Sequence, residues 1–165
     1  MDDAERLAEL QKSGRDFFAP WDPLRDEAYF TVQGQCADVR NALVRHGRGE
    51  ALPHVILDEE GQVVGRITFS GITHGPFQSC SMGYWVSPES NGRGYATQAV
   101  RRMTALAFEE LGLHRVQAET LAHNARSQHV LRRTGFTRYG LAPLYLKIAG
   151  RWQDHVMFQL LTDRA

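Results

Sequence analysis

The sequence has few cysteines and no excess of charge of either sign. Its 165 residues include two cysteines, Cys36 and Cys80, which are too few for a disulfide framework. No Cys-x-x-Cys or His-Glu-x-x-His spacing suggests a metal site. Lys plus Arg and Asp plus Glu each number 19, so the basic excess that drives nonspecific nucleic-acid binding is missing. We therefore expect no bound metal and no direct nucleic-acid partner.

Long hydrophobic runs are missing as well. No stretch approaches the roughly 18 apolar residues of a membrane span. The N-terminus carries Asp2, Asp3 and Glu5 without the apolar region of a signal peptide. We expect a cytoplasmic protein with no membrane partner. The length and the 42% hydrophobic content predict one domain over residues 1–165 with a substantial core.

Hydrophobic periodicity and turn residues predict an α+β fold with a mixed, mostly antiparallel sheet flanked by helices. Two helices, ending near Gly14 and Gly47, come first. The remaining elements alternate between strands and helices: a three-strand meander over 53–58, 63–70 and 78–86, a helix over 96–111, a strand over 114–121, a short helix over 124–134, and a final hairpin of 136–148 and 152–161.

The most informative segment joins the end of the third strand to the long helix through Gly92 and Gly94. The first turn of a helix has unpartnered N–H groups, and the helix dipole adds about half a positive charge there. Glycines remove the Cβ atoms that would keep a phosphate away from those groups. The segment predicts an anion site, although a glycine turn before an ordinary helix is the simpler interpretation.

Two common phosphate motifs do not fit this loop. A P-loop needs a Lys followed by Ser or Thr, and nothing here supplies that Lys. The dinucleotide-binding fingerprint needs a third Gly or Ala where this chain has Thr97. Its acidic residue should end a second strand, whereas Glu109 and Glu110 fall on the same helix. A kinase-type ATP site and an NAD site are both disfavoured.

A second segment, in which Asn124 caps a helix that ends at Gly135, suggests a family. Together with the glycine loop it resembles the GNAT superfamily of acyl-CoA N-acetyltransferases. The family signature falls on Asn91, Gly94 and Ala96, with Asn91 in place of the usual Gln or Arg. Further matches are typical of its RimJ/RimL branch of ribosomal-protein-alanine N-acetyltransferases: Trp21, the strand 83–86, the Asn124 and Ser127 spacing, and the tail 135–155.

The resemblance implies acetyl-CoA as the donor and direct attack by an amine, without an acyl-enzyme. The cofactor-binding residues it implies are Val86, Asn91, Gly92, Arg93, Gly94, Tyr95, Ala96 and Asn124. The implied acceptor is the N-terminal α-amine of a protein, with a ribosomal protein that has N-terminal Ala as the expected substrate. The implied assembly is a monomer or homodimer. The family begins with a strand that this sequence lacks, so either the start is truncated or a sheet edge lies bare.

The resemblance also assigns catalytic roles. The backbone N–H of Val86 stabilises the oxyanion, Ser127 offers a hydroxyl near the sulfur, and Glu119 stands where some relatives place a base. The roles of Ser127 and Glu119 each have an alternative: Ser is common in the first turn of a capped helix, and Glu119 shares a strand face with Arg115 and Gln117, as in a solvated ion-pair face. His74 and His123 are other candidate bases, and water alone could suffice because a terminal α-amine has a pKa of about 8.

Trp21 and Tyr145 are the candidate walls of the acceptor site, with core packing as the alternative. Two other functions remain open. A small amine such as a polyamine, an amino acid or an aminoglycoside could be the acceptor. The chain could also be an acyl-CoA-binding module without catalysis.

Overall fold

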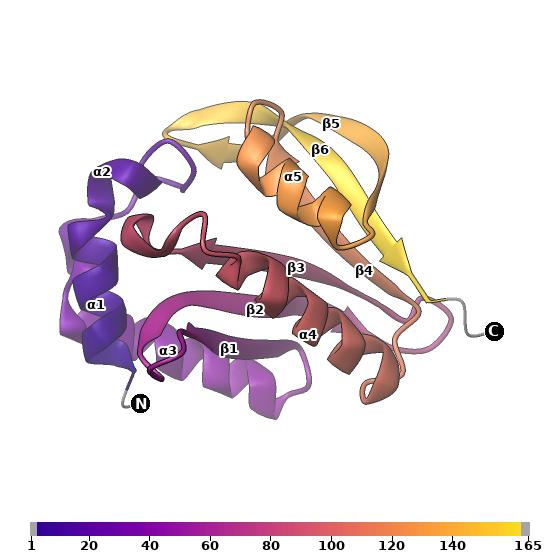
Figure 1. The fold of residues 1–165 in the computed structure, drawn as a ribbon, viewed down its shortest axis with the longest axis horizontal. Coiled ribbons are helices and arrows are strands. Elements are labelled where there is room, and N and C mark those ends of the chain that lie inside the picture. The colour runs from indigo at the N-terminus through magenta and orange to yellow at the C-terminus, as the bar shows by residue number, and fades with distance from the viewer. Residues whose placement is uncertain (1–2, 163–165) are drawn as a thin grey trace.

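The computed structural model describes residues 3–162 as a six-strand sheet flanked by helices (Figure 1). The strand order is β1-β2-β3-β4-β6-β5, which confirms the predicted α+β class. The strands are β1 (Ala51–Leu57), β2 (Val63–Thr73), β3 (Ser79–Val86), β4 (Arg115–Leu121), β5 (Thr137–Ile148) and β6 (Arg151–Leu161). The helices are α1 (Ala4–Ser13), α2 (Arg15–Phe18), α3 (Val32–Gly47), α4 (Tyr95–Glu109) and α5 (Ala125–Arg133), with short 3-10 helices at Glu27–Phe30 and Pro88–Ser90.

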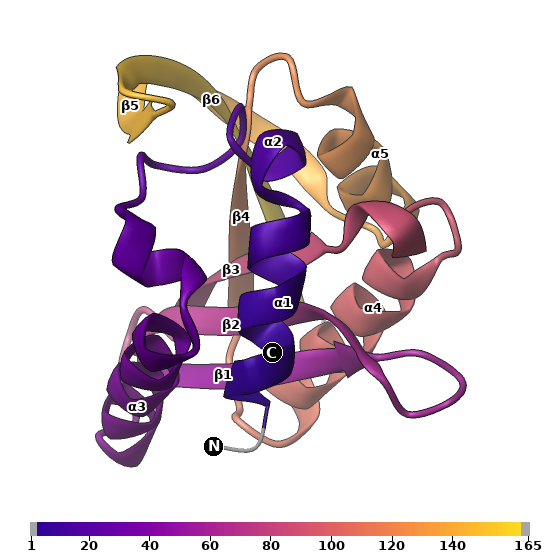
Figure 2. The same cartoon turned by 90° about the vertical axis from the view of Figure 1, so that its left-hand side faces the viewer.

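Helices cover both faces of the sheet, as Figure 2 shows in a view close to its edge. Helices α4 and α5 bury the larger core, in which Val100 and Met103 of α4 and Leu131 of α5 pack against Val116 and Phe158 of the sheet. On the opposite face α1 and α3 form a smaller cluster around three buried side chains: Leu7, Leu10 and Val63. Helices α1 and α4 thus bury an apolar stripe, as their periodicity predicts. Helix α3 does not, because Leu43 and Val44 are about half exposed.

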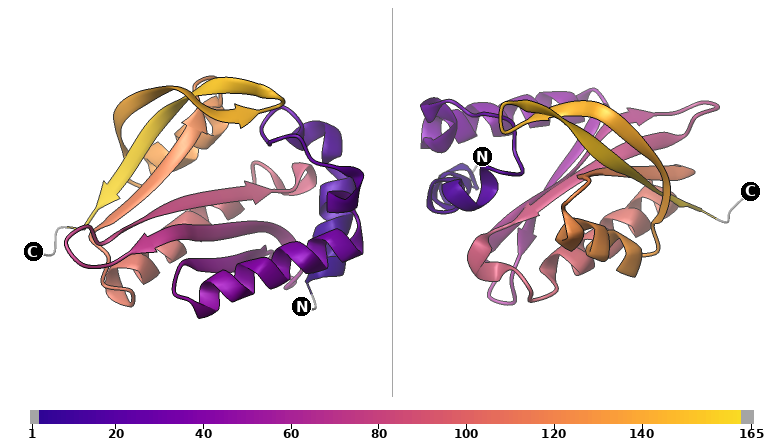
Figure 3. Two further views of the ribbon diagram at one scale, coloured as in Figure 1. Left: turned by 180° about the vertical axis from the view of Figure 1, so that it is seen from behind. Right: turned by 90° about the horizontal axis from the view of Figure 1, so that it is seen from above.

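The first three strands form the predicted antiparallel meander, but β3 and β4 pair only briefly. Their parallel register joins Ser79–Ser81 to Arg115–Gln117 and then stops. From Met82 on β3 and Ala118 on β4 the two strands diverge, as Figure 3 (left) shows from behind. We call the opening between residues 82–86 and 118–121 the wedge. The facing strand edges there have no ladder partner within residues 3–162.

Both ends of the sheet are edges within the described residues. No strand precedes α1 there, and β1 pairs only with β2, so the predicted lack of a first strand is confirmed for that part of the chain. At the other end β5 pairs only with β6. No helix in residues 3–162 is long and apolar enough to cross a membrane.

Candidate active site

The glycine loop leaves the start of α4 open. Gly92 and Gly94 have φ of +78° and +88°, in the left-handed region that favours glycine. A Cβ added at Gly92 would meet nothing within 4 Å, and one at Gly94 would meet only the Gln98 amide at 3.9 Å. The first turn of α4, which begins at Tyr95, carries no acidic residue. The positive end of this 15-residue helix therefore faces free space of the kind an anion can fill.

The β1–β2 turn holds this loop in place through Glu59. The Tyr95 hydroxyl donates to Glu59 Oε2 over 2.6 Å, and the Arg93 guanidinium lies 3.5 Å from the same oxygen. Arg93 also lies over the Tyr95 ring, 5.2 Å from its centroid. The hydrogen bond from Tyr95 and the charge of Arg93 lower the pKa of the Glu59 carboxyl. No sequence motif points to Glu59, because a contact that spans 36 residues leaves no local pattern.

Val86 ends β3 with its backbone turned towards the wedge. The next residue, Ser87, donates its N–H to Val64 on β2 over 2.8 Å. Successive residues of an antiparallel strand turn their N–H and C=O groups to opposite sides, so those of Val86 point away from β2. The Asn91 amide donates to the Val86 carbonyl over 3.4 Å. Asn91 thus braces the end of the strand, and the Val86 N–H faces the wedge.

Asn124 and Ser127 meet at the start of α5, on the α4 side of the sheet. The Asn124 side chain accepts from the Ser127 N–H over 3.1 Å, which confirms the predicted cap. The Ser127 hydroxyl lies 3.0 Å from the hydroxyl of Tyr84 on β3. Burial raises the pKa of Tyr84 to about 12, partly offset by its bond to Ser127. The sequence singled out this strand but gave Tyr84 no role.

Glu119 lies on the other face of the sheet, half-buried beside the wedge. The Ser81 hydroxyl donates to Glu119 Oε1 over 3.2 Å. Burial raises the pKa of the Glu119 carboxyl, while the bond from Ser81 and the nearby His155 act in the opposite direction. Within residues 3–162 Glu119 forms no ion pair, and Arg115 bonds to Gln159 instead. The ion-pair interpretation of this strand face is therefore wrong.

Two aromatic contacts border this face. The Tyr145 ring lies 5.5 Å from the ring of the buried His155, which sits diagonally across the β4–β6 ladder from Glu119. The Trp21 ring lies 5.5 Å from the His123 ring, which joins the segment after α2 to the β4–α5 connection. Neither Trp21 nor Tyr145 belongs to either core cluster. The core-packing interpretation of these two residues is therefore wrong.

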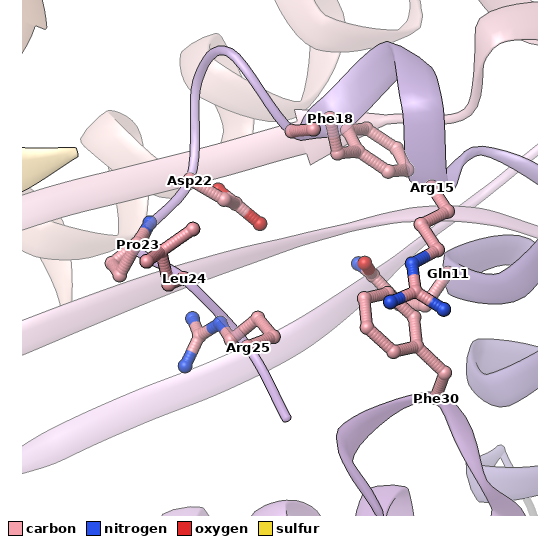
Figure 4. Close-up of a pocket in the computed structure, with 9 residues that line it drawn as sticks. Gln11, Arg15, Phe18, Asp22, Pro23, Leu24, Arg25 and Phe30 are labelled. Atoms are coloured by element: carbon pink, nitrogen blue, oxygen red, sulfur yellow. The ribbon is translucent and has the colours of Figure 1, made fainter. Parts of the chain in front are cut away.

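A pocket of about 150 Å³ opens between α1, α2 and the segment that follows them (Figure 4). Phe18 and Phe30 form apolar walls, and the side chains of Gln11 and Asp22 also line the space. Phe18 packs edge-on against Trp85 of β3, on the strand face that also carries Ser81. The pocket thus lies on the Glu119 side of the sheet. The Ala149 N–H donates to the Asp22 carbonyl over 2.9 Å, so the β5–β6 turn is tied to this segment.

The predicted site residues therefore form two groups on opposite faces of the wedge. Val86, Asn124 and Ser127 face α4 and α5 together with the glycine loop. Glu119, Trp21 and Tyr145 lie on the α1 side, and no hydrogen bond links Glu119 to Ser127 within the described residues. His74 is exposed in the connection between β2 and β3, at the end of the sheet where β3 and β4 pair. A ligand that passes through the wedge could reach both groups.

The match to known sequences decides the family. A family model described as the acetyltransferase (GNAT) domain matches residues 1–137. The chain belongs to the GNAT acetyltransferase family. It is 34% identical over 161 residues to ribosomal protein uS5-alanine N-acetyltransferase from Escherichia coli (strain K12), with 97% of this chain and 83% of that protein covered.

Solved structures of GNAT enzymes agree with this fold. The ribosomal-protein-S5-alanine acetyltransferase from Vibrio fischeri superposes with a TM-score of 0.92 at 32% identity, covering 99% of this chain and 90% of that one. Mycobacterium smegmatis RimJ in complex with CoA-disulfide gives a TM-score of 0.94 at 29% identity, covering 98% of this chain and 78% of that one. The chain is thus an N-acetyltransferase that uses acetyl-CoA.

The residues present suit acetyl-CoA as a substrate. The open glycine loop can take its pyrophosphate, and the unpaired edges of β3 and β4 can take the amides of its pantetheine arm. Beside the wedge, the Thr120 hydroxyl is buried without a hydrogen-bond partner. No group of three or more His, Cys, Asp or Glu side chains in residues 3–162 is placed to hold a metal.

Proposed function

We propose that the protein transfers an acetyl group from acetyl-CoA to the N-terminal α-amine of a protein, by direct attack in a ternary complex. The observation that carries this proposal is the wedge, which has an anion cradle on one face and the half-buried Glu119 on the other. Cys80 gives no support to an acyl-enzyme, because burial raises the pKa of its thiol to about 12 and a thiol in that state is a poor nucleophile.

On the donor side, N–H groups of the loop from Gly92 to Ala96 would hold the pyrophosphate, with Asn91, Arg93 and Tyr95 shaping the loop. Asn124 would flank the pantetheine arm. The Val86 N–H would then donate to the thioester oxygen as negative charge develops on it. Asn91 supports this role because it holds the Val86 carbonyl on the same side of the strand.

On the acceptor side, Glu119 would take the proton of the incoming amine. Its raised pKa suits a base, since a carboxylate that holds protons more tightly is a better acceptor. An α-amine with a pKa of about 8 is roughly a tenth neutral at pH 7, whereas a lysine with a pKa of about 10.4 is neutral far less often. The neutral form that attacks is therefore far more abundant for a chain terminus than for a lysine side chain.

A ribosomal protein with N-terminal Ala is the proposed acceptor. The names of two relatives support it, since both are alanine acetyltransferases of a small-subunit ribosomal protein. Trp21 and Tyr145 would border the entry of the peptide, and the pocket between Phe18 and Phe30 would lie along its path.

A substrate panel tests this function. The protein is incubated with acetyl-CoA and one of three acceptors: a peptide with N-terminal Ala, the same peptide with a blocked N-terminus and one Lys, or a polyamine. We expect free thiol and an acetylated product with the first peptide only. Transfer only to the blocked peptide, or only to the polyamine, would refute acetylation of a protein N-terminus. CoA binding without turnover of any acceptor would refute enzymatic activity.

Ser127→Ala tests the hydroxyl near the sulfur. The Asn124 cap uses the Ser127 backbone, so the change removes the hydroxyl and leaves the cap in place. We expect kcat to fall by about 10-fold to 100-fold, as for the loss of one hydrogen bond to a charged group, with KM for acetyl-CoA little changed. Ser127→Thr, which keeps a hydroxyl, is the matched control. An unchanged kcat in Ser127→Ala would show that the hydroxyl has no part in the reaction.

A further inference from the structure

The hydroxyls of Tyr84 and Ser127 meet at the wedge from opposite elements. The Tyr84 oxygen lies 3.0 Å from Ser127 Oγ and 3.3 Å from the Ser127 carbonyl oxygen. Tyr84 comes from β3 and Ser127 from the first turn of α5, so their contact bridges 43 residues of sequence. It joins the strand that ends in Val86 to the helix that Asn124 caps. No sequence pattern assigned Tyr84 a function.

The proton on Tyr84 has two possible acceptors, and the choice decides where the Ser127 proton points. If Tyr84 donates to the Ser127 carbonyl, the Ser127 hydroxyl can donate back to Tyr84 and turns away from the wedge. If Tyr84 donates to Ser127 Oγ, the contact with the shorter distance, the Ser127 proton is free to point into the wedge. A phenol whose pKa is raised to about 12 keeps its proton throughout the neutral range, so Tyr84 is always a donor.

We propose that Tyr84 is a positioning residue: its hydroxyl donates to Ser127 Oγ and directs the Ser127 proton at the departing sulfur. This inference rests on the proposed function. A hydroxyl that accepts one hydrogen bond donates the next more strongly, so Tyr84 also makes Ser127 a better donor. The hydrogen bond from Tyr84 on β3 also fixes the Ser127 side chain, which the Asn124 cap leaves free to rotate because it uses only the Ser127 backbone.

The transfer step balances without consuming either hydroxyl. The bond between the acceptor nitrogen and the acetyl carbon forms, and the carbon–sulfur bond breaks. The acceptor ammonium loses two protons: one goes to solvent by way of Glu119, and the other ends on the sulfur. While negative charge collects on the sulfur, Ser127 donates a hydrogen bond to it and Tyr84 donates to Ser127. Both side chains return to their starting state.

A purely structural role is the main alternative, because the Tyr84 ring also packs against the larger core. Tyr84→Phe keeps that ring and removes only the hydroxyl. We expect it to lower kcat about 5-fold to 10-fold, as for the loss of one hydrogen bond, with unchanged CoA affinity. Tyr139→Phe is the matched control, since it removes a hydroxyl that bonds to Gln117, away from Ser127. Its kcat should equal that of the parent.

A double-mutant cycle decides between the two roles. If Tyr84 acts through Ser127, adding Tyr84→Phe to Ser127→Ala should lower kcat no further. A further loss in the double variant, an unchanged kcat in Tyr84→Phe alone, or a loss of CoA affinity in that variant would overturn the proposal. The proposed function is judged separately: if no acceptor is acetylated by the parent, it fails and this inference with it. If the parent is active but the cycle is additive, only the inference fails.

Discussion

Gly94→Val is expected to raise KM for acetyl-CoA by about 100-fold and to change kcat much less. A side chain at this position would project from a backbone with φ of +88° into open space at the start of α4. That is the space proposed for the pyrophosphate, whose contacts with backbone N–H groups are each worth roughly 1.5–3 kcal/mol as bonds to a charged group. Loss of about one or two such bonds gives the expected factor. Acetyl-CoA titration with a saturating acceptor measures it.

Gly112→Val is the matched control at the other end of α4. Gly112 also has a positive φ, +62°, and a Cβ there would likewise meet nothing within 4 Å. Both changes strain the backbone in the same way. Thermal unfolding should therefore shift similarly in the two variants, while KM for acetyl-CoA rises only in Gly94→Val. Equal KM values for acetyl-CoA in the two variants would show that the glycine loop does not bind the pyrophosphate.

Glu119→Gln is expected to lower kcat by about 100-fold, the low end of what a positioned base contributes. The base must be ionised to accept a proton, and burial raises the pKa of this carboxyl above its ordinary value of 4.5. In the parent, kcat should therefore fall as the pH drops through that raised pKa, which gives the pH profile of kcat an acidic limb. The variant should lack this limb. Gln117→Ala, two residues earlier on the same strand face, should keep both the rate and the limb.

Stability provides an independent check on Glu119. Because the pKa of Glu119 is raised in the folded state, the unfolded chain releases this proton first as the pH rises. The ionised side chain thus disfavours folding above its ordinary pKa of 4.5. Glu119→Gln should be no less stable than the parent at pH 7, as measured by thermal unfolding. If Glu119→Gln keeps the kcat of the parent, Glu119 is not the base, and water removes the proton of the amine.

Local patterns were enough to predict most of the elements. The glycine loop and its helix, the Asn124 cap and the meander all depend on residues close in sequence, and the structure confirms them. Helix α2 and the two 3-10 helices were not predicted, since they are too short for apolar periodicity to reveal.

The contacts that complete the site could not be predicted, because they join distant segments. Tyr84 reaches Ser127 across 43 residues, and Tyr95 reaches Glu59 across 36. The predicted strands 53–58 and 63–70 leave Glu59 in the turn between them, as observed, but give no sign that this turn touches the glycine loop. The resemblance implied the role of the Val86 N–H, but no residue pattern predicted the wedge itself, since no residue type marks where a parallel ladder stops.

Asn91 illustrates the same limit. The sequence showed only that it departs from the Gln or Arg of the family signature. In the structure its amide binds the carbonyl of Val86, the residue whose N–H is the proposed oxyanion donor. A short side chain suits that contact, because the two residues are only five positions apart.

The most direct test of the account is a crystal structure of the protein with a non-reactive acetyl-CoA analogue. We predict the pyrophosphate on the N–H groups of residues 92–96, the pantetheine arm between β3 and β4, and the acetyl oxygen on the Val86 N–H beside Ser127. An analogue bound outside the wedge, for example in the pocket between Phe18 and Phe30, would contradict the account.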